Sequence, residues 1–206
     1  MYRENLNRIV GAVALGIVLA CGLGIWIYFY YFTPEYSRVG YQPSQVISFS
    51  HKVHNGQLNI DCRYCHYLVE ESSIAGMPES TLCMNCHNQA LARDDRLSYI
   101  RKSIASSSAV YYTRVNRVAD YVWFNHAVHT RRGIGCVNCH GNVQEMDKTY
   151  QSKSLSMKLC LDCHRNPAQW IVPLDKVTQP LAAQNHINLI KEWNIRTSDE
   201  CSQCHR

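Results

Sequence analysis

Residues 49–66 read FSHKVHNGQLNIDCRYCH, and this stretch decides the architecture of the chain. A phenylalanine precedes two histidines that are three residues apart, and a C-x-x-C-H motif follows after a glycine. Residues 124–140, FNHAVHTRRGIGCVNCH, present the same residue types in the same order. Each copy is followed by one further C-x-x-C-H motif, so residues 49–87 and 124–164 form an internal repeat.

Five C-x-x-C-H motifs account for ten of the eleven cysteines in the chain. Their cysteine pairs are Cys62 and Cys65, Cys83 and Cys86, Cys136 and Cys139, Cys160 and Cys163, and Cys201 and Cys204; the histidines that close them are His66, His87, His140, His164 and His205. This spacing is the attachment signature of haem c, because two thiols bond the porphyrin and the next imidazole reaches the iron. The sequence therefore predicts five covalently bound haems c, each with its iron.

Two other uses of paired cysteines fit the sequence less well. Zinc ribbons also contain C-x-x-C pairs, but a histidine would follow such a pair by chance only about 5% of the time. Here a histidine follows all five pairs. A thioredoxin-like redox motif would accompany alternating strands and helices, which this sequence does not indicate. An odd number of cysteines, eleven, also excludes a complete set of disulfides within the chain.

The remaining histidines match the number of haems. Five of the ten histidines lie outside the motifs and are the predicted distal ligands, namely His51, His54, His126, His129 and His186. Because a six-coordinate haem needs a second axial ligand, this supply predicts bis-histidine ligation, with His186 serving the Cys201 site. Methionine is the alternative ligand for one haem, since Met77, Met146 and Met157 lie close to motifs.

Residues 9–32 form a long apolar stretch without a charged residue. As a helix it would extend about 36 Å, enough for a hydrocarbon core of roughly 30 Å and longer than the apolar part of a signal peptide. Arg3 and Arg8 precede it, and aromatic residues gather at its far end. This asymmetry predicts an uncleaved, single-pass anchor in the cytoplasmic (inner) membrane, with the N-terminus inside and the haem domain on the periplasmic or extracellular side.

Small residues recur every four positions along this stretch, at Ala12, Gly16, Ala20 and Gly24. Small side chains let membrane helices approach closely, so this face predicts packing against another subunit of a larger membrane complex. The alternative is that glycine and alanine are simply common in membrane helices. Cys21, the cysteine outside the motifs, is predicted to be an apolar membrane residue.

The rest of the chain predicts a mainly α fold with extensive loops and little or no sheet, in which haems supply much of the apolar interior. We assign residues 1–8 to a cytoplasmic N-terminus, 9–32 to the transmembrane helix, 33–48 to a linker and 49–206 to a pentahaem domain. Within that domain, 88–123 connect the repeats 49–87 and 124–164, and 165–206 form the fifth-haem segment. Residues 88–105 are predicted to form one helix that ends at the serines 106–108.

The overall composition excludes two function classes. A long disordered tail is excluded, because apolar residues make up 46% of the chain and no block of like charges appears. A formal net charge of +5 with only 18% charged residues is too mild to indicate nucleic acid binding.

The paired F-x-H-x-x-H and C-x-x-C-H segments resemble the class III multihaem cytochromes c. With the fifth motif and the anchor, the chain resembles more closely the pentahaem, membrane-anchored cytochrome subunit of alternative complex III, a quinol-oxidising respiratory or photosynthetic assembly. The resemblance rests on segments 49–66, 75–87, 120–141, 156–167 and 195–206. It implies that His51 ligates the haem of Cys62 and Cys65, and that His126 ligates the haem of Cys136 and Cys139. His54 and His129 would reach other haems, which the sequence leaves open.

The resemblance implies an electron-transfer subunit and not an enzyme in its own right. It would receive electrons from quinol oxidation in partner subunits through an iron–sulfur subunit, and pass them to a soluble cytochrome c or blue-copper protein. Six-coordinate haems fit this role, because they leave no open iron position for a substrate. The alternatives are a multihaem enzyme, which needs a five-coordinate haem, and a self-contained quinol-dehydrogenase anchor, whose first haem lies close to the membrane.

Overall fold

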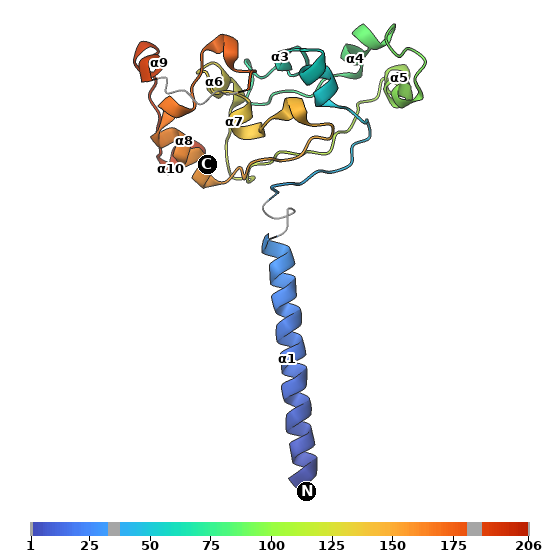
Figure 1. Cartoon of the computed structure of the whole chain (residues 1–206), viewed down its shortest axis with the longest axis vertical. Coiled ribbons are helices and arrows are strands. Elements are labelled where there is room, and N and C mark those ends of the chain that lie inside the picture. The colour runs from blue at the N-terminus through green and yellow to red at the C-terminus, as the bar shows by residue number, and fades with distance from the viewer. Residues whose placement is uncertain (1, 33–37, 181–186, 206) are drawn as a thin grey trace.

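The computed structural model describes residues 2–32, 38–180 and 187–205. Figure 1 shows one long helix and a domain of short helices joined by long irregular segments. In those ranges no strand forms, and only two isolated bridges occur, Val122 with His205 and Ile134 with Ile171. The predicted mainly α fold with an N-terminal apolar helix and little or no sheet is confirmed.

The long helix, α1, covers Tyr2–Phe32 and contains the predicted span. Its segment Asn5–Phe32 has a mean hydropathy of 2.4 and is long and apolar enough to cross a membrane. None of its 18-residue apolar window is buried in the described structure. A helix that is apolar on all sides and is not buried by its own domain is a candidate membrane span. No atom lies within 4 Å of where a side chain would begin at Gly16 or Gly24.

Short helices carry the five motifs. They are α3 (Cys62–Cys65), α4 (Ser80–His87), α7 (Val137–His140), α8 (Met157–Arg165) and α10 (Cys201–Cys204). The distal histidines of the repeats lie on or beside the π-helix η1 (Lys52–Gln57) and α6 (His126–Thr130). The other helices are η2 (Asp95–Leu97), α5 (Ser98–Ala105), η3 (Val143–Glu145), η4 (Pro167–Gln169), η5 (Leu174–Lys176) and α9 (Ile187–Glu192).

Side-chain caps explain why helices begin where they do beside two of the sites. The carboxylate of Asp61 accepts a hydrogen bond from the backbone N–H of Arg63 at 2.8 Å and starts α3. Asn125 accepts one from the N–H of Val128 at 3.3 Å and starts α6. Such caps satisfy backbone donors that the first helical turn leaves without a partner.

The prediction of one helix over residues 88–105 is wrong in its first half. Residues 88–93 form turns, and Leu91 adopts a left-handed backbone conformation with a φ of 58° that interrupts a helix. The side chain of Asp94 then accepts from the N–H of Arg96, which starts η2 and leads into α5. The predicted end is right, because α5 stops at Ala105.

The conventional core of the domain is small. Among the described residues, nine apolar side chains are buried, and one cluster of them consists of Ile47, Leu97 and Ile100 beside α5. A domain of this length usually buries a much larger share of its apolar residues. The chain therefore depends on something other than its own aliphatic side chains to organise its interior, as the haem-packed fold predicts.

Candidate haem-binding sites

Three pairs of imidazole rings face each other at nearly the same separation. The ring centroids are 6.1 Å apart for His54 and His87, 6.4 Å for His126 and His140, and 6.2 Å for His129 and His164. A metal–imidazole bond is about 2 Å long and the ring centre lies about 1.2 Å beyond the nitrogen, so two imidazoles across one metal have centres about 6.4 Å apart. Each pair therefore has the spacing of two axial ligands of one haem iron.

His51 and His66 interact electrostatically as a fourth pair. Burial, followed by the charge of His66 and then that of His54, lowers the pKa of His51 to about 4. His51 therefore lies close to His66 and stays neutral near pH 7. Neutral imidazole is the form that binds a metal.

The pairing follows one rule in both repeats. The first histidine of F-x-H-x-x-H, His51 or His126, lies near the histidine of the next motif. The second, His54 or His129, faces the histidine of the motif after that one. The structure thus places His51 and His126 near the motifs that were predicted for them. It also places His54 and His129, whose motifs the sequence left open, opposite His87 and His164.

The phenylalanine that opens each repeat contacts both distal histidines. The ring of Phe49 meets His51 edge-on at 4.9 Å and stacks on His54 at 4.3 Å. Phe124 does the same, edge-on to His126 at 4.8 Å and stacked on His129 at 4.5 Å. One aromatic ring thus fixes the orientation of two imidazoles. Its recurrence in both repeats was the sequence signal for this role, which we did not assign from the sequence alone.

Hydrogen bonds at Nδ1 set the tautomer of most of these histidines. Nδ1 lies beside a backbone carbonyl oxygen in six of them: His54 with Ser50 (2.9 Å), His66 with Gly76 (2.8 Å), His87 with Ala90 (3.1 Å), His126 with Ser73 (2.9 Å), His129 with Asn125 (2.7 Å) and His164 with Ser198 (2.6 Å). A carbonyl can only accept, so Nδ1 carries the proton and Nε2 keeps a lone pair. This is the arrangement by which proteins orient a metal-binding imidazole.

The donor set fits haem c better than zinc. In the part of the chain that the structure describes, no three side chains of His, Cys, Asp or Glu converge as a structural zinc site requires. The imidazoles instead occur as opposed pairs beside paired thiols, which suits a porphyrin iron with two axial ligands.

Comparison with known proteins identifies the family of the chain. The model of the family described as cytochrome c7 and related cytochrome c matches residues 47–108 and 122–206. The chain belongs to this family. The cytochrome is also 27% identical over 215 residues to the multihaem cytochrome c subunit of menaquinone reductase from Nitratidesulfovibrio vulgaris, a match that covers 93% of this chain and 88% of the relative. It is a multihaem cytochrome c that binds haem c covalently and transfers electrons rather than catalysing a reaction.

The fifth motif of the cytochrome has different surroundings. The Tyr121 ring lies 5.5 Å from the ring of His205, and residue 205 pairs with Val122 in a bridge. The N–H of Trp123 donates to the carbonyl of Cys204 at 2.8 Å. The predicted distal ligand, His186, lies outside the described residues.

The three methionines weighed as alternative ligands differ in burial. Met146 is 5% exposed, and its carbonyl accepts from the N–H of Lys52. Met77 and Met157 are 54% and 65% exposed. In the three sites with opposed imidazole rings, and in the site where His51 lies near His66, a methionine is not needed to complete the ligand set.

Burial shifts the pKa values of several groups at the third and fourth motifs. It lowers the pKa of His140 to about 4, with His126 contributing next, and it lowers the pKa of His129. Burial also raises the pKa of Cys139 and of Cys163 to about 11. These groups therefore face the interior of the domain, where an apolar porphyrin would be shielded from water.

Proposed function

We propose that this cytochrome is the pentahaem electron-transfer subunit of a quinol-oxidising membrane complex of the alternative complex III type. It passes electrons from partner subunits through five haems c to a soluble periplasmic acceptor. The observation that supports this best is the set of opposed histidine pairs at the spacing of two ligands on one iron. Two imidazoles on one iron leave no position for a substrate, so electron transfer is the chemistry that remains.

Different residues of the chain would bind the porphyrin and the iron of each haem. The ten motif cysteines would form thioethers, the five motif histidines would ligate one face of each iron, and His51, His54, His126 and His129 would ligate the other face at four sites. When bound, haem c supplies a one-electron couple between ferric and ferrous iron. The carbonyls at Nδ1 hold each ring in place and favour the ligating tautomer.

At the fifth site, Cys201, Cys204 and His205 would hold the haem, and His186 is the proposed distal ligand. A methionine ligand, from Met77, Met146 or Met157, is the alternative for one of the five haems. It would raise the reduction potential of that haem above those of its bis-histidine neighbours.

The membrane part of the proposal rests on α1. The helix anchors the chain in the cytoplasmic membrane, with residues 1–8 inside and the haem domain in the periplasm. The aromatic residues near its end, such as Trp26 and Tyr30 whose rings stack at 5.4 Å, suit the membrane–water interface. The face of Ala12, Gly16, Ala20 and Gly24 is the proposed contact with partner spans.

Two directions of electron flow have support. The resemblance to alternative complex III favours quinol oxidation, with an iron–sulfur subunit as donor and a soluble cytochrome c or blue-copper protein as acceptor. The relative from Nitratidesulfovibrio vulgaris is a subunit of a menaquinone reductase, which favours the reverse direction. The same haem sites serve either direction, because electron exchange between six-coordinate haems is reversible.

The test is to compare the purified complex with the purified chain in lipid nanodiscs. A pyridine haemochrome assay and the mass of the chain should give five haems c, and ferric EPR spectra should show low-spin signals alone. A quinol should reduce the haems in the complex and not in the chain alone. Reduction of the isolated chain would favour the self-contained quinol-dehydrogenase anchor, and a high-spin ferric signal would favour the multihaem enzyme.

If quinol reduces the haems of the complex and a soluble acceptor reoxidises them, the quinol-oxidising direction holds. If the haems are reduced by a soluble donor and reoxidised by menaquinone, the complex works as a menaquinone reductase. A chain with fewer than five haems would overturn the pentahaem assignment itself.

A further inference from the structure

The five motifs are numbered here as sites 1 to 5 in chain order, from Cys62–His66 to Cys201–His205. We propose that these sites form a single unbranched row in the order 2, 1, 3, 4, 5, so that electrons enter and leave at sites 2 and 5. The inference rests on the proposed function in one respect, because it takes all five sites to hold haem. The row order departs from the order along the chain.

Sites 1 and 2 are neighbours. Their distal histidines, His51 and His54, share the ring of Phe49. The Nδ2 amide of Asn85 on α4 donates to the Tyr64 hydroxyl on α3 at 3.3 Å. Cys65 of site 1 also lies close enough to Cys83 and Cys86 of site 2 to interact with them electrostatically.

Sites 1 and 3 meet across the two repeats. The sulfur atoms of Cys62 and Cys136 lie close enough to interact with each other. His126, which faces the site 3 histidine, is held by the carbonyl of Ser73 in the segment that follows site 1. Next to the thiols, the Thr178 hydroxyl donates to Asp61 at 3.1 Å, while the N–H of Cys136 donates to Val177.

Sites 3 and 4 repeat the relation between sites 1 and 2. Their distal histidines, His126 and His129, share the ring of Phe124. Cys139 of site 3 interacts electrostatically with Cys160 of site 4. The internal repeat therefore supplies two equivalent pairs of sites, which the contact between sites 1 and 3 joins into a row of four.

Site 5 continues the row from site 4. The His164 ring donates from Nδ1 to the carbonyl of Ser198 at 2.6 Å, and the Thr197 hydroxyl donates back to the His164 carbonyl at 2.6 Å. Arg165 forms an ion pair with Asp199 at 3.3 Å. Cys160 and Cys204 also interact electrostatically.

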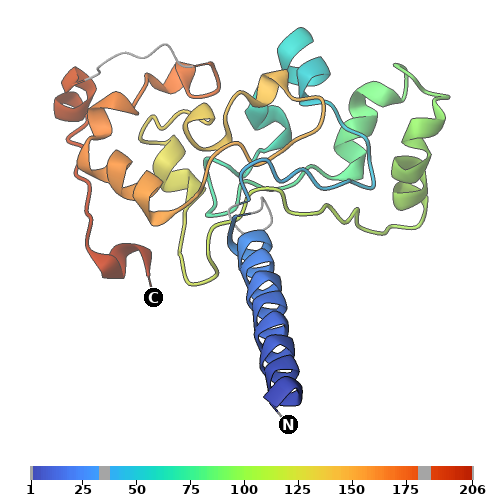
Figure 2. The ribbon, with the colours of Figure 1, turned by 60° about the horizontal axis from the view of Figure 1, so that its bottom comes forward.

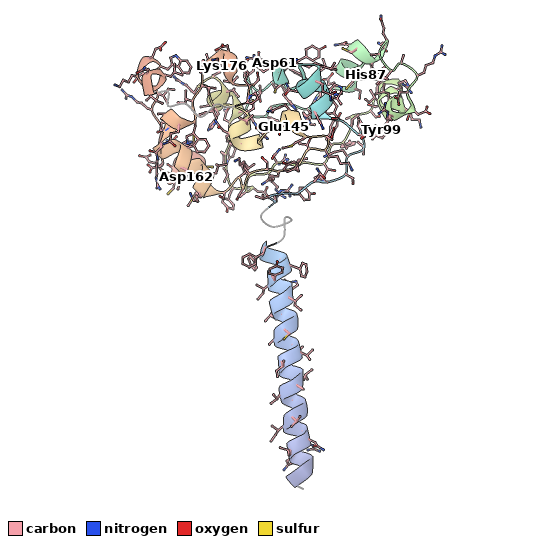
Figure 3. All side chains as sticks on the ribbon, viewed as in Figure 1. Asp61, His87, Tyr99, Glu145, Asp162 and Lys176 are labelled. Atoms are coloured by element: carbon pink, nitrogen blue, oxygen red, sulfur yellow. The ribbon has the colours of Figure 1, made fainter. Side chains whose placement is uncertain are left out.

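Exposure and position support the choice of ends. Of the ten motif cysteines, only Cys86 of site 2 and Cys201 of site 5 are exposed. Figure 2 shows α4 toward one side of the domain and α10 toward the other, with α3 and α7 between them. In Figure 3, His87 of site 2 and Asp162 of the site 4 motif lie on opposite sides of the domain, with Asp61 and Glu145 between them.

A row constrains how electrons move. Each transfer oxidises one site by one electron and reduces its neighbour by one. A one-electron donor at one end and a one-electron acceptor at the other complete the balance. The exposed ends let partner proteins approach sites 2 and 5, while electrons cross from one repeat to the other between sites 1 and 3.

The test uses the same substitution at equivalent positions of the repeats, in the purified full-length protein. His54→Met alters an end site, site 2, and His129→Met alters an interior site, site 4. Each variant should raise the midpoint potential of its own haem. Because neighbouring charges interact, the EPR-monitored titration of His54→Met should show a shift in one other haem, and that of His129→Met in two others.

Equal numbers of shifted haems in the two variants, or a larger number in His54→Met, would overturn the row. A second measurement needs no variant and covers the case in which a substitution prevents haem loading. Redox titration of the unaltered protein followed by NMR should find two haems with one strong redox interaction and three haems with two. A haem with three strong interactions, or five haems with two each, would contradict the order.

Haem content separates the two proposals. The unaltered protein is first assayed by pyridine haemochrome and mass. Fewer than five haems would defeat the proposed function, whereas five haems with a different interaction pattern would defeat only the order.

Discussion

The two repeats have nearly identical ligand geometry but differ in what holds their ligands. The second distal histidines, His54 and His129, are oriented locally, because each Nδ1 bonds the carbonyl four residues earlier. The first distal histidines are oriented from the opposite repeat. His51 meets the hydroxyl of Thr149 at 2.9 Å, and His126 meets the carbonyl of Ser73 at 2.9 Å. Each repeat therefore completes a ligand of the other.

The local ligands recur because the F-x-H-x-x-H pattern itself produces them. The stacked separations of Phe49 with His54 and Phe124 with His129 are 4.3 and 4.5 Å, although the first segment is a π-helix and the second an α-helix. The two first distal histidines, which the opposite repeat orients, have different acceptors: His51 has the Thr149 side chain and His126 has the Ser73 backbone carbonyl. Short-range geometry is therefore the same in both repeats, and the interface between the repeats breaks the equivalence.

The largest predicted difference between the repeats concerns the glycine that follows each histidine pair. A Cβ at Gly133 would collide with the Val172 carbonyl, and Gly133 also has a positive φ of 75°. A Cβ at Gly56 would collide with the Gln144 carbonyl, without a left-handed φ. Gly133→Ala should therefore lower the free energy of unfolding by about 3–4 kcal/mol and Gly56→Ala by about 2 kcal/mol. Urea denaturation of the haem-loaded protein measures both, and the reverse order would contradict the structure.

Removal of the shared aromatic ring should have the same effect in both repeats. Phe49→Ala and Phe124→Ala each remove a half-buried ring that contacts two imidazoles. Each should cost about 2 kcal/mol of unfolding free energy and should alter the EPR g-values of two haems. A difference of more than about 1 kcal/mol between the variants would show that surroundings, and not the motif, set the local geometry.

Loss of the contact between His51 and Thr149, which joins the two repeats, should affect site 1 alone. In the tautomer that leaves Nε2 for iron, Nδ1–H of His51 donates to Thr149. Thr149→Val removes this acceptor, which should cost about 1 kcal/mol and raise the midpoint potential of site 1. Thr113→Val is the control, because Thr113 is exposed and bonds Gln45 through its backbone atoms. If both variants gave the same potentials, the contact would have no role in tuning site 1.

The smallest predicted effect is a loss of folding stability at low pH. It arises at the first motif of the first repeat and has no counterpart at the first motif of the second repeat. Hydrogen bonds from Arg63 are the main cause of the lowered pKa of Asp61, the residue before Cys62; Gly135 holds the corresponding position before Cys136. Because the pKa is lowered on folding, this stabilisation is full above the unfolded pKa of about 4 and is lost as the pH falls through the folded value. Asp61→Asn keeps a capping side chain and removes the charge.

Asp61→Asn should therefore lower stability by less than about 1 kcal/mol at pH 7, since both side chains are partly exposed, and it should flatten the loss of stability below pH 4. Urea midpoints between pH 3 and pH 7 measure this change. Asp175→Asn, at an exposed carboxylate of η5, is the matched control. An unchanged pH profile in Asp61→Asn would show that the ion pair is not linked to folding.

The sequence by itself determined the features that depend on short spacing. It predicted the five haem motifs, the two F-x-H-x-x-H patterns, the apolar helix and the mainly α fold, because each is set by residues within a turn or two of one another. The same reasoning failed over 88–97, where Leu91 and Asp94 end one helical segment and start another. There the sequence kept a helical pattern of residues, but the left-handed backbone conformation of Leu91 interrupted the helix.

Only the tertiary structure decided which histidines face each other across long loops. In each repeat the first distal histidine already pairs with the next motif. Spacing along the chain therefore did not predict which motif the second distal histidine, His54 or His129, would reach. The tie between Ser73 and His126 and the contact between Cys62 and Cys136 join residues far apart in the chain. Loops without periodicity carry no sequence signal for where they lead. The order of the sites therefore arises from packing between the repeats, whereas each site arises from its own motif.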